Sequence, residues 1–431
     1  MVSADSVNLD VLELIFAYLA GNDLASIALV SRSFFAGVIP RLYSTLLFRL
    51  SHAKRYPAVM SPFAAVAAHP EFAIHVRHVD IRTVPVVKTQ YNPKFLLECT
   101  RALDLCPNII SFRCSINALP PFIAGLTQKD RLRDLRIHAS LTTSQSTRLV
   151  KLSKVRNLTL DFPSWNILNL LPQWAVTLRD NLTTLTLFMA NELNETVLET
   201  ALVELPGLLG LHVVGCAKVD HVAIFNLVSH TPLLESLSIT TGDANRALPQ
   251  PPASLACLRY LSIDVRLVPI SPMLPPTTSA LSAIMTSHQR LLPAPHLLHP
   301  AHGPTLKNLS FIDCTLGTAD SLAALCKGCT QLERLELWIP VRDLTIFTNA
   351  IGKSSTLRML VDVETHTHNP RPTLTQDSVR FMMKAVPTLQ KIIIDGGRIW
   401  TRRKNTQGEL NVGLERRSPN RAAIHWFMPR E

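Results

Sequence analysis

One hydrophobic pattern recurs through most of this 431-residue chain and limits how it can fold. The pattern is Leu-x-x-Leu-x-Leu, in which other aliphatic residues or Phe can replace Leu. Twelve copies begin at residues 76, 109, 132, 155, 182, 208, 234, 258, 306, 332, 357 and 389. Most steps from the second copy onward are 23–27 residues, but one of 48 could contain a degenerate or interrupted repeat. A period of this length is typical of a solenoid of stacked repeats.

Each copy of the pattern predicts one short strand followed by one helix. Leu-x-Leu alternation buries two side chains on one face of a strand. Between copies, apolar residues recur at helical spacing, as in Val197, Leu198, Ala201, Leu202 and Leu205. Neither element buries its apolar face without a neighbouring repeat. We therefore expect an α/β fold: a helical N-terminal unit, then a solenoid with a curved parallel sheet and helices on its convex side.

Composition supports repeated aliphatic packing and argues against several other classes of protein. The chain has 67 leucines, is 47% hydrophobic and is 17% charged, which excludes a disordered chain. It has only 15 glycines, and neither a dinucleotide-binding fingerprint nor a P-loop is present. No nucleophile–base motif such as Gly-x-Ser-x-Gly occurs, and Cys326-x-x-Cys329 has no second pair nearby. We expect a non-enzymatic protein with no cofactor and no metal site.

Two segments depart from the repeat. Residues 267–306 contain eight prolines and a single charged residue, Arg290, so we expect a loop insertion there. Residues 396–431 are expected to form a basic tail, because eight Lys or Arg and three Glu follow from Arg398 onward. The basic clusters at 402–404 and 416–417 have the spacing of a bipartite nuclear-import signal.

The chain start and its apolar stretches bear on where the protein works. Residues 1–9 lack a basic region and a clean apolar run, so no secretory signal is visible. Prolines interrupt the uncharged stretch 267–289, so we expect no membrane span. A cytoplasmic and/or nuclear location follows, with the eight cysteines as reduced thiols.

Residues 7–48 form a separate, helical N-terminal unit. On a helical wheel, the apolar residues between 11 and 19 span about 200° of the helix. An ordinary surface helix needs an apolar stripe of roughly 100°. The first helix therefore needs two contacts, one inside its own unit and one outside it.

This N-terminal unit resembles an F-box. The usual form of that family is Leu-Pro-x-Glu-aliphatic-Leu, then Ile-x-x-Tyr-Leu, Asp-Leu and Val-Cys-Arg-x-Trp. The corresponding residues are Asp10-Val11-Leu12, Ile15-Phe16-Ala17-Tyr18-Leu19, Asp23-Leu24, Val30-Ser31-Arg32-Ser33-Phe34 and Leu42-Tyr43. Val7-Asn8 stands in place of Leu-Pro, and Ser31 and Phe34 replace Cys and Trp. The repeats resemble a leucine-rich-repeat array over roughly residues 76–395.

An F-box followed by leucine-rich repeats implies a substrate receptor of a Skp–cullin–F-box ubiquitin ligase. The implied organisation is an F-box-like unit at 1–50, a solenoid at 51–395 and the basic tail. The F-box would bind a Skp-type adaptor, and through it a cullin, while the repeats bind a protein substrate. The residues implied for the adaptor face and the motif's own core are Leu12, Ile15, Phe16, Leu19, Leu24 and Val30, and the sequence does not divide them.

The repeats themselves indicate where a substrate would bind. When the first, fourth and sixth positions of a copy are buried, the third, fifth and seventh point to the concave face. Arginine and aromatic residues at such positions are typical interface anchors. The candidates are Arg82, Arg113, Arg136, Phe188, His212, Tyr260, Arg334 and Trp338.

Two other functions are compatible with the same sequence. One is a repeat scaffold or inhibitor that never meets a ligase, in which residues 7–48 only cap the solenoid. The other is a nucleic-acid-binding protein that uses the basic tail with Arg82, Arg113 and Arg136. The net charge of +11 favours acidic partners only weakly, so we expect a protein ligand rather than nucleic acid or a membrane.

Overall fold

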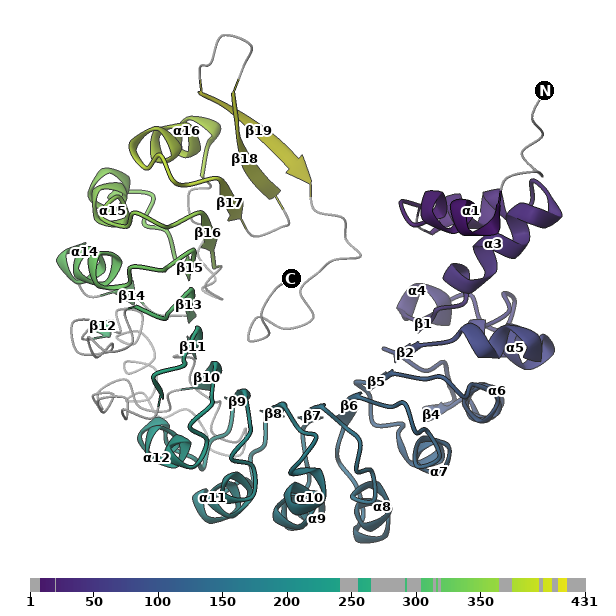
Figure 1. Ribbon diagram of the computed structural model, residues 1–431. Helices are drawn as coiled ribbons and strands as arrows, with labels where there is room; N and C mark the ends of the chain where they lie inside the picture. Colours follow the sequence, from purple (N-terminus) through teal and green to yellow (C-terminus); the bar gives the residue numbers. More distant parts are fainter. Residues whose placement is uncertain are drawn as a thin grey trace. The chain divides into compact units, whose positions relative to one another are not determined.

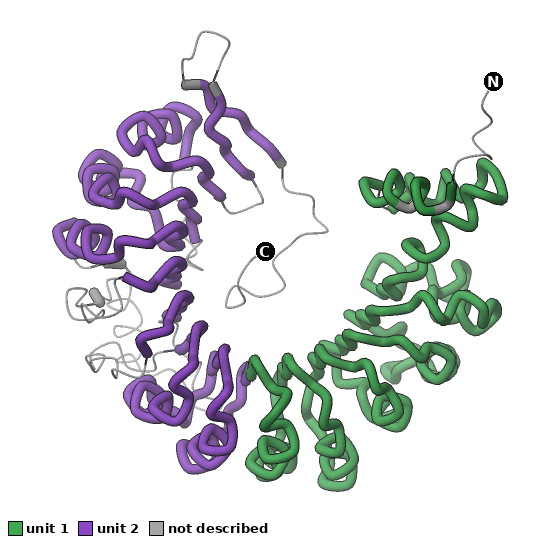
Figure 2. Tube along the Cα trace, in the orientation of Figure 1, with its two compact units in different colours: residues 1–185 green, residues 186–431 purple. Residues whose placement is uncertain are grey.

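The computed structural model describes residues 8–19, 21–240, 255–264, 291–292, 304–312, 315–316, 319–363, 374–394, 398–404 and 410–416. The chain divides into two compact units, Met1–Leu185 and Thr186–Glu431 (Figure 2). In each unit, strands line one side and helices the other (Figure 1).

Unit 1 begins with a head of three helices, which we define as residues 8–43. They are α1 (Leu9–Phe16), α2 (Asn22–Ile27) and α3 (Arg32–Leu42). The strands that follow are β1 (Thr45–Phe48), β2 (His78–Ile81), β5 (Ser111–Cys114), β6 (Asp134–His138), β7 (Asn157–Asp161) and β8 (Thr184–Phe188), the last of which runs past the division at residue 185. Strands β1, β2, β5, β6 and β7 pair in this order, and every pair is parallel.

The connections of unit 1 are mostly helical. The helices are α4 (Leu50–Ala53), α5 (Pro62–Ala68), α6 (Pro93–Leu105), α7 (Ile123–Leu126), α8 (Thr143–Leu149), α9 (Trp165–Leu168) and α10 (Leu171–Leu178), with 3-10 helices η2 (Pro70–His75) and η3 (Pro120–Phe122). A small hairpin, β3 (Val86–Val87) with β4 (Gln90–Tyr91), precedes α6. Side chains of Ser61, Asn92 and Thr142 cap the N-termini of α5, α6 and α8, which explains why these helices begin there.

Unit 2 continues the alternation of strand and helix. Its main strands are β9 (Gly210–Val214), β10 (Ser236–Thr240), β11 (Tyr260–Asp264), β13 (Asn308–Ile312), β15 (Arg334–Leu337), β16 (Met359–Asp362) and β17 (Lys391–Ile394), all parallel. Its helices are α11 (Glu195–Val203), α12 (His221–Leu227), α14 (Ala319–Gly328), α15 (Leu344–Ile351) and α16 (Gln376–Ala385), with the 3-10 helix η4 (Val228–His230). Two short strands, β12 (Leu291–Leu292) and β14 (Thr315–Leu316), pair separately.

All twelve copies of the sequence pattern form strands, and each strand starts two residues after the first position of its copy. The fourth and sixth positions point into the core, as shown by Leu158 and Leu160, which are 1% and 0% exposed. Side chains also bind neighbouring repeats: the indole of Trp174 donates to the Leu152 carbonyl over 2.9 Å. The predicted α/β solenoid of leucine-rich-repeat type is confirmed.

Three features of the array differ from the sequence expectations. Strand β11 pairs directly with β13, so the strands on either side of the 48-residue step are neighbours in the sheet. Strand β1 lies before residue 50, the expected end of the N-terminal unit, yet its pairing with β2 makes it part of the sheet. The expected tail contains β18 (Arg398–Lys404) and β19 (Leu410–Arg416), which extend the sheet in antiparallel fashion from β17. Of the insertion at 267–306, only residues 291–292 and 304–306 are described.

Truncating an inward leucine should destabilise the array strongly. We expect Leu160→Ala to lower the free energy of unfolding by about 2–5 kcal/mol, because it leaves a cavity between stacked repeats. The matched control is Leu97→Ala on α6, where the side chain is 69% exposed and the cost should stay within about 0.5 kcal/mol. Urea denaturation followed by circular dichroism checks both, and equal losses would contradict the assignment of Leu160 to the core.

Candidate protein-interaction surfaces

Helix α1 presents apolar side chains on two faces. On one face, Leu12 and Phe16 are each 2% exposed. They pack with Leu24 and Val38 in the core of the head. The second face carries Val11 (45% exposed), Leu14 (69%) and Ile15 (53%), and Tyr18 (92%) lies in the turn directly after α1. We call these four residues the docking face.

The structure divides the six residues that the F-box resemblance implied. Leu12, Phe16 and Leu24 belong to the core, and Leu19 is partly buried against it. Ile15 and Val30 are instead exposed, Val30 by 65%. Leu29 is 88% exposed and was not among the six, although it is adjacent to Val30 in the sequence. Its exposure depends on where α2 ends, which the apolar pattern does not reveal.

Helix α3 holds α1 in place through close packing and polar contacts. A Cβ added to Gly37 would lie 3.1 Å from the Phe16 ring, so glycine permits this close approach of the two helices. The Arg41 guanidinium donates to the Ala17 and Leu19 carbonyls just beyond the end of α1, over 2.5 and 3.4 Å. The Ser31 hydroxyl accepts from the Phe34 amide over 3.2 Å and caps α3, which gives serine a structural role at the position where the family has cysteine.

An aromatic cluster joins the head to the first repeat. Phe72 on η2 lies 4.6 Å from Tyr43 and 6.2 Å from Phe35, measured between ring centroids. Burial of Tyr43, with the Glu71 carboxylate nearby, raises the pKa of its phenol. These contacts hold the head against the repeats of the same unit.

The third, fifth and seventh positions of the copies form aligned rows on the strands, which we call the strand face. Parallel register places His78, Ser111, Asp134 and Asn157 side by side at the third position. The fifth position gives a second row, in which Asp80, Arg113, Arg136 and Thr159 are aligned. Side chains that are 23–33 residues apart in the sequence are therefore neighbours on this face.

The three candidate arginines of unit 1 have different environments. Arg82 is exposed and binds Asp80 at 2.9 Å, while Arg113 is half-buried. Arg136 is 4% exposed and forms a bidentate ion pair with Asp161 of the next repeat, at 2.9 and 3.1 Å. The prediction that Arg136 is an accessible anchor is wrong. Its guanidinium, at the fifth position of one repeat, is buried against the Asp161 carboxylate, at the seventh position of the next repeat.

The sequence candidates also omit an aromatic residue of unit 1. Phe162 follows the seventh position of its copy, is 44% exposed and stacks on His138 with ring centroids 5.4 Å apart. Its φ of 50° is uncommon for a bulky side chain and turns the backbone at the end of β7. Phe162 occupies the eighth position of its copy, one beyond the positions from which the candidates were chosen.

The candidates of unit 2 include both half-buried and buried side chains. Phe188, Tyr260 and Trp338 are half-buried on the strand face. Arg334 donates to Glu336 over 2.8 Å. His212 is 2% exposed, so the expectation that its ring is accessible on this face is corrected. The His212 ring lies 2.8 Å from the Ser238 hydroxyl, and burial lowers the pKa of its imidazole to about 4.

The Cys-x-x-Cys pair at 326 and 329 lies in the described part of the chain. Cys326 and Cys329 are buried, and burial raises the pKa of the two thiols to about 12 and about 11, so neither is a ready thiolate ligand. Within the described ranges, no group of three or more His, Cys, Asp or Glu side chains could hold a metal ion. None of the helices described combines the length and apolarity needed to cross a bilayer.

The basic doublet at 402–403 is part of the folded structure. The Arg402 guanidinium donates to the Leu389 and Val386 carbonyls over 2.9 and 3.1 Å. Arg403 pairs with Glu415 across the β18–β19 hairpin at 2.9 Å. Residues 417–431 lie outside the described part of the chain, including the second half of the expected import signal at 417.

Comparisons with known proteins do not show what these surfaces bind. A scan against protein-family models and a search of curated protein sequences gave no match. Among solved structures, one match is the yeast complex described as Rad7 and Elc1. It has 16% sequence identity and a TM-score of 0.43, over 85% of this chain and 92% of that one.

The buried Arg136–Asp161 pair predicts a strong asymmetry between single and double substitutions. Asp161→Ala should cost about 3–5 kcal/mol of unfolding free energy, because it removes a carboxylate from a buried guanidinium. Arg136→Met combined with Asp161→Leu should cost clearly less, since no charge then remains to be buried. Urea denaturation of the three proteins tests this, and a double variant as unstable as Asp161→Ala would contradict it.

The buried His212 predicts a loss of stability on acidification. Its folded pKa of about 4 is below the ordinary value of 6.5, so the unfolded chain binds the proton first as the pH falls. The stabilisation is complete above pH 6.5 and declines toward pH 4, by about 2 kcal/mol between pH 7 and pH 5. Unfolding free energies measured at both pH values should fall less for His212→Asn than for wild type, and identical losses would refute the assignment.

Proposed function

We propose that this protein is the substrate-recognition subunit of a Skp–cullin–F-box ubiquitin ligase. The head binds a Skp-type adaptor, and through it a cullin, while the strand face binds a protein substrate. The F-box resemblance of residues 7–48 supplies the class of adaptor, and the surfaces of the head and repeats support the assignment.

The observation that carries the proposal is the docking face of α1. Leu12 and Phe16 already provide the apolar contact that the head needs for its own core. The docking face adds three exposed apolar side chains on α1 and the 92% exposed ring of Tyr18 in the turn after it. Exposed apolar surface of this kind is typical of a helix that binds a partner. The wide apolar stripe of the first helix predicts one contact outside the head, and we assign that contact to the adaptor.

The connection between head and repeats suits a receptor that must hold its substrate in a defined place. Phe72 packs against Tyr43 and Phe35, so α3 and the first repeat share an aromatic contact. A receptor of this type contributes proximity, since fixing two reactants in position can replace much of the entropic cost of their meeting. Ubiquitin transfer itself would be carried out by partner subunits.

The strand face supplies possible anchors in each unit. Arg82 and Arg113 are accessible or half-buried in unit 1 and suit an acidic group of a substrate. Tyr260 and Trp338 are half-buried in unit 2 and suit apolar or aromatic groups. We assign substrate binding to these residues rather than to Arg136 and His212, which are buried.

The experiment is co-purification of the full chain with a Skp-type adaptor. Leu14→Asp combined with Ile15→Asp should weaken binding at least about 100-fold, because two apolar contacts are lost and charges would be buried. Both side chains lie outside the head's core, so the fold should persist by circular dichroism.

The matched control is Leu97→Asp combined with Ile346→Asp, whose side chains are 69% and 57% exposed on α6 and α15. This variant should bind the adaptor like wild type. If wild type itself fails to retain the adaptor, the ligase assignment is wrong and a repeat scaffold or inhibitor without ligase association takes its place. Equal weakening by both variants would also count against the docking face.

A further inference from the structure

Positive charge is concentrated in two consecutive turns of unit 1. Residues 127–133 lead into β6, and residues 150–156 lead into β7. Together they contain six Lys or Arg side chains and one acidic residue, Asp130. We call these two turns the basic ridge. It lies at the helix-to-strand edge of the repeats and includes none of the sequence candidates.

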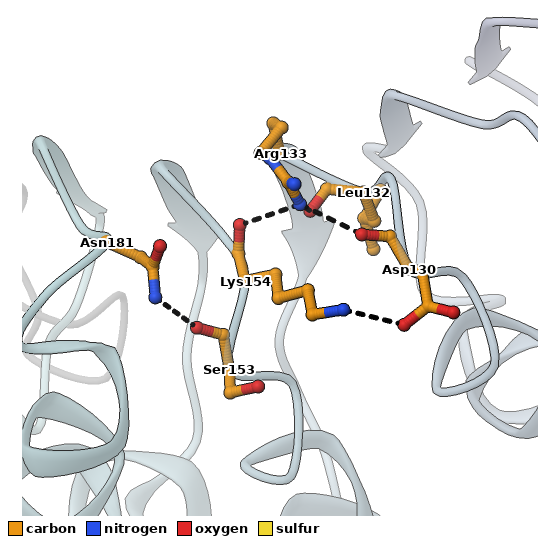
Figure 3. A network of polar contacts seen from close by, with 6 residues as sticks. All are labelled: Asp130, Leu132, Arg133, Ser153, Lys154 and Asn181. Atoms are coloured by element: carbon orange, nitrogen blue, oxygen red, sulfur yellow. Dashed lines mark hydrogen bonds and ion pairs between the residues drawn. The ribbon is translucent and has the colours of Figure 1, made fainter.

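The repeat geometry brings these cations together. The Arg156 amide donates to the Arg133 carbonyl over 2.7 Å, so the two arginines start adjacent strands side by side. The Arg133 guanidinium also donates to the carbonyls of Asp130, Leu132 and Lys154, over 3.0–3.4 Å (Figure 3). These bonds hold the two turns against each other.

The single carboxylate of the ridge already has a partner. The Lys154 ammonium lies 2.8 Å from the Asp130 carboxylate (Figure 3) and is the main cause of a lowered pKa of Asp130. Arg131, Lys151 and Arg156 are exposed and form no ion pair with any described residue. The ridge therefore presents uncompensated positive charge to solvent.

The equivalent turns of unit 2 have no such excess. In the described ranges 203–209, 229–235, 255–259, 304–307, 329–333, 352–358 and 386–390 there are four Lys or Arg and three Glu. Arg259 and Glu235 in these turns pair with each other at 3.5 Å. The ridge carries a net charge of +5 (six Lys or Arg and one Asp), out of +11 for the whole chain, and this concentration indicates a specific anionic partner.

The composition of the ridge indicates which anion it fits. None of its side chains is a large exposed hydrophobic residue, whereas protein interfaces use aromatic and apolar anchors and contain few lysines. The absence of aromatic side chains from these turns also removes the stacking platforms that single-stranded nucleic acid requires. Contacts to duplex phosphates need only closely spaced cations.

We propose that the basic ridge binds the phosphate backbone of duplex nucleic acid without reading its sequence. This binding is separate from the adaptor and substrate surfaces and does not depend on the ligase assignment. A duplex carries about one negative charge per 1.7 Å of helix axis, so several of its phosphates can meet a small group of exposed cations at once.

The test is fluorescence anisotropy of a labelled duplex of mixed sequence, titrated with the full chain at about 50 to 200 mM salt. If Arg131, Lys151 and Arg156 each meet a phosphate, log K should fall with log salt with a slope of about −3. Combining Arg131→Gln, Lys151→Gln and Arg156→Gln should make the slope shallower by about 3 and weaken binding at low salt at least about tenfold. All three side chains are exposed, so folding should be unaffected.

The matched control combines Lys353→Gln, Arg358→Gln and Lys384→Gln, which removes the same charge from exposed positions of unit 2. It should leave the slope and the affinity near those of wild type. Equal effects of the two triple variants would show that net charge rather than the ridge is responsible and would overturn the proposal. So would absence of duplex binding at low salt, or competition by polyglutamate as effective as that by unlabelled duplex, which would identify an acidic protein partner.

Discussion

The structure depends on one constraint: each strand–helix unit can bury its apolar side chains only against the next unit. Leu158 and Leu160 point into the core, while the residues between them face the other way, and parallel pairing repeats this arrangement from strand to strand. Equivalent positions of successive repeats therefore become neighbours. The Arg136–Asp161 pair, the His212–Ser238 contact and the basic ridge all follow from that alignment.

The first and last repeats of such a stack have a neighbouring repeat on one side only, and different elements lie on the free side at each end. At the start of unit 1, β1 follows the head directly, and the head packs on the first repeat through Phe72. At the end of unit 2, β18 pairs with β17 in antiparallel fashion and β19 with β18, so β17 is not left as an open edge. The segments at both ends thus add strands to the sheet, and the first of them also carries the docking face.

The strands could be predicted from the sequence because three positions of each repeat are buried. Those positions stay apolar when Leu is replaced by another aliphatic residue or Phe, so their spacing remains recognisable. Strand β1 was not predicted, since Thr45–Phe48 lies at the end of the segment expected to be helical and lacks a complete copy of the pattern. The site residues were harder to predict because exposure depends on neighbours: nothing near Arg136 in the sequence reveals that Asp161 lies beside it. The division of α1 between Leu12 in the core and Leu14 at the surface likewise required the position of α3.

We propose the head as a docking module whose second apolar face is completed by an adaptor. Hydrogen–deuterium exchange of the full chain, with and without a Skp-type adaptor, tests it most directly. Adaptor binding to the head should slow exchange in residues 8–43, most strongly in α1, with little change in β6, β7 or the strands of unit 2. Unchanged exchange in α1 together with protection of the repeats would contradict it.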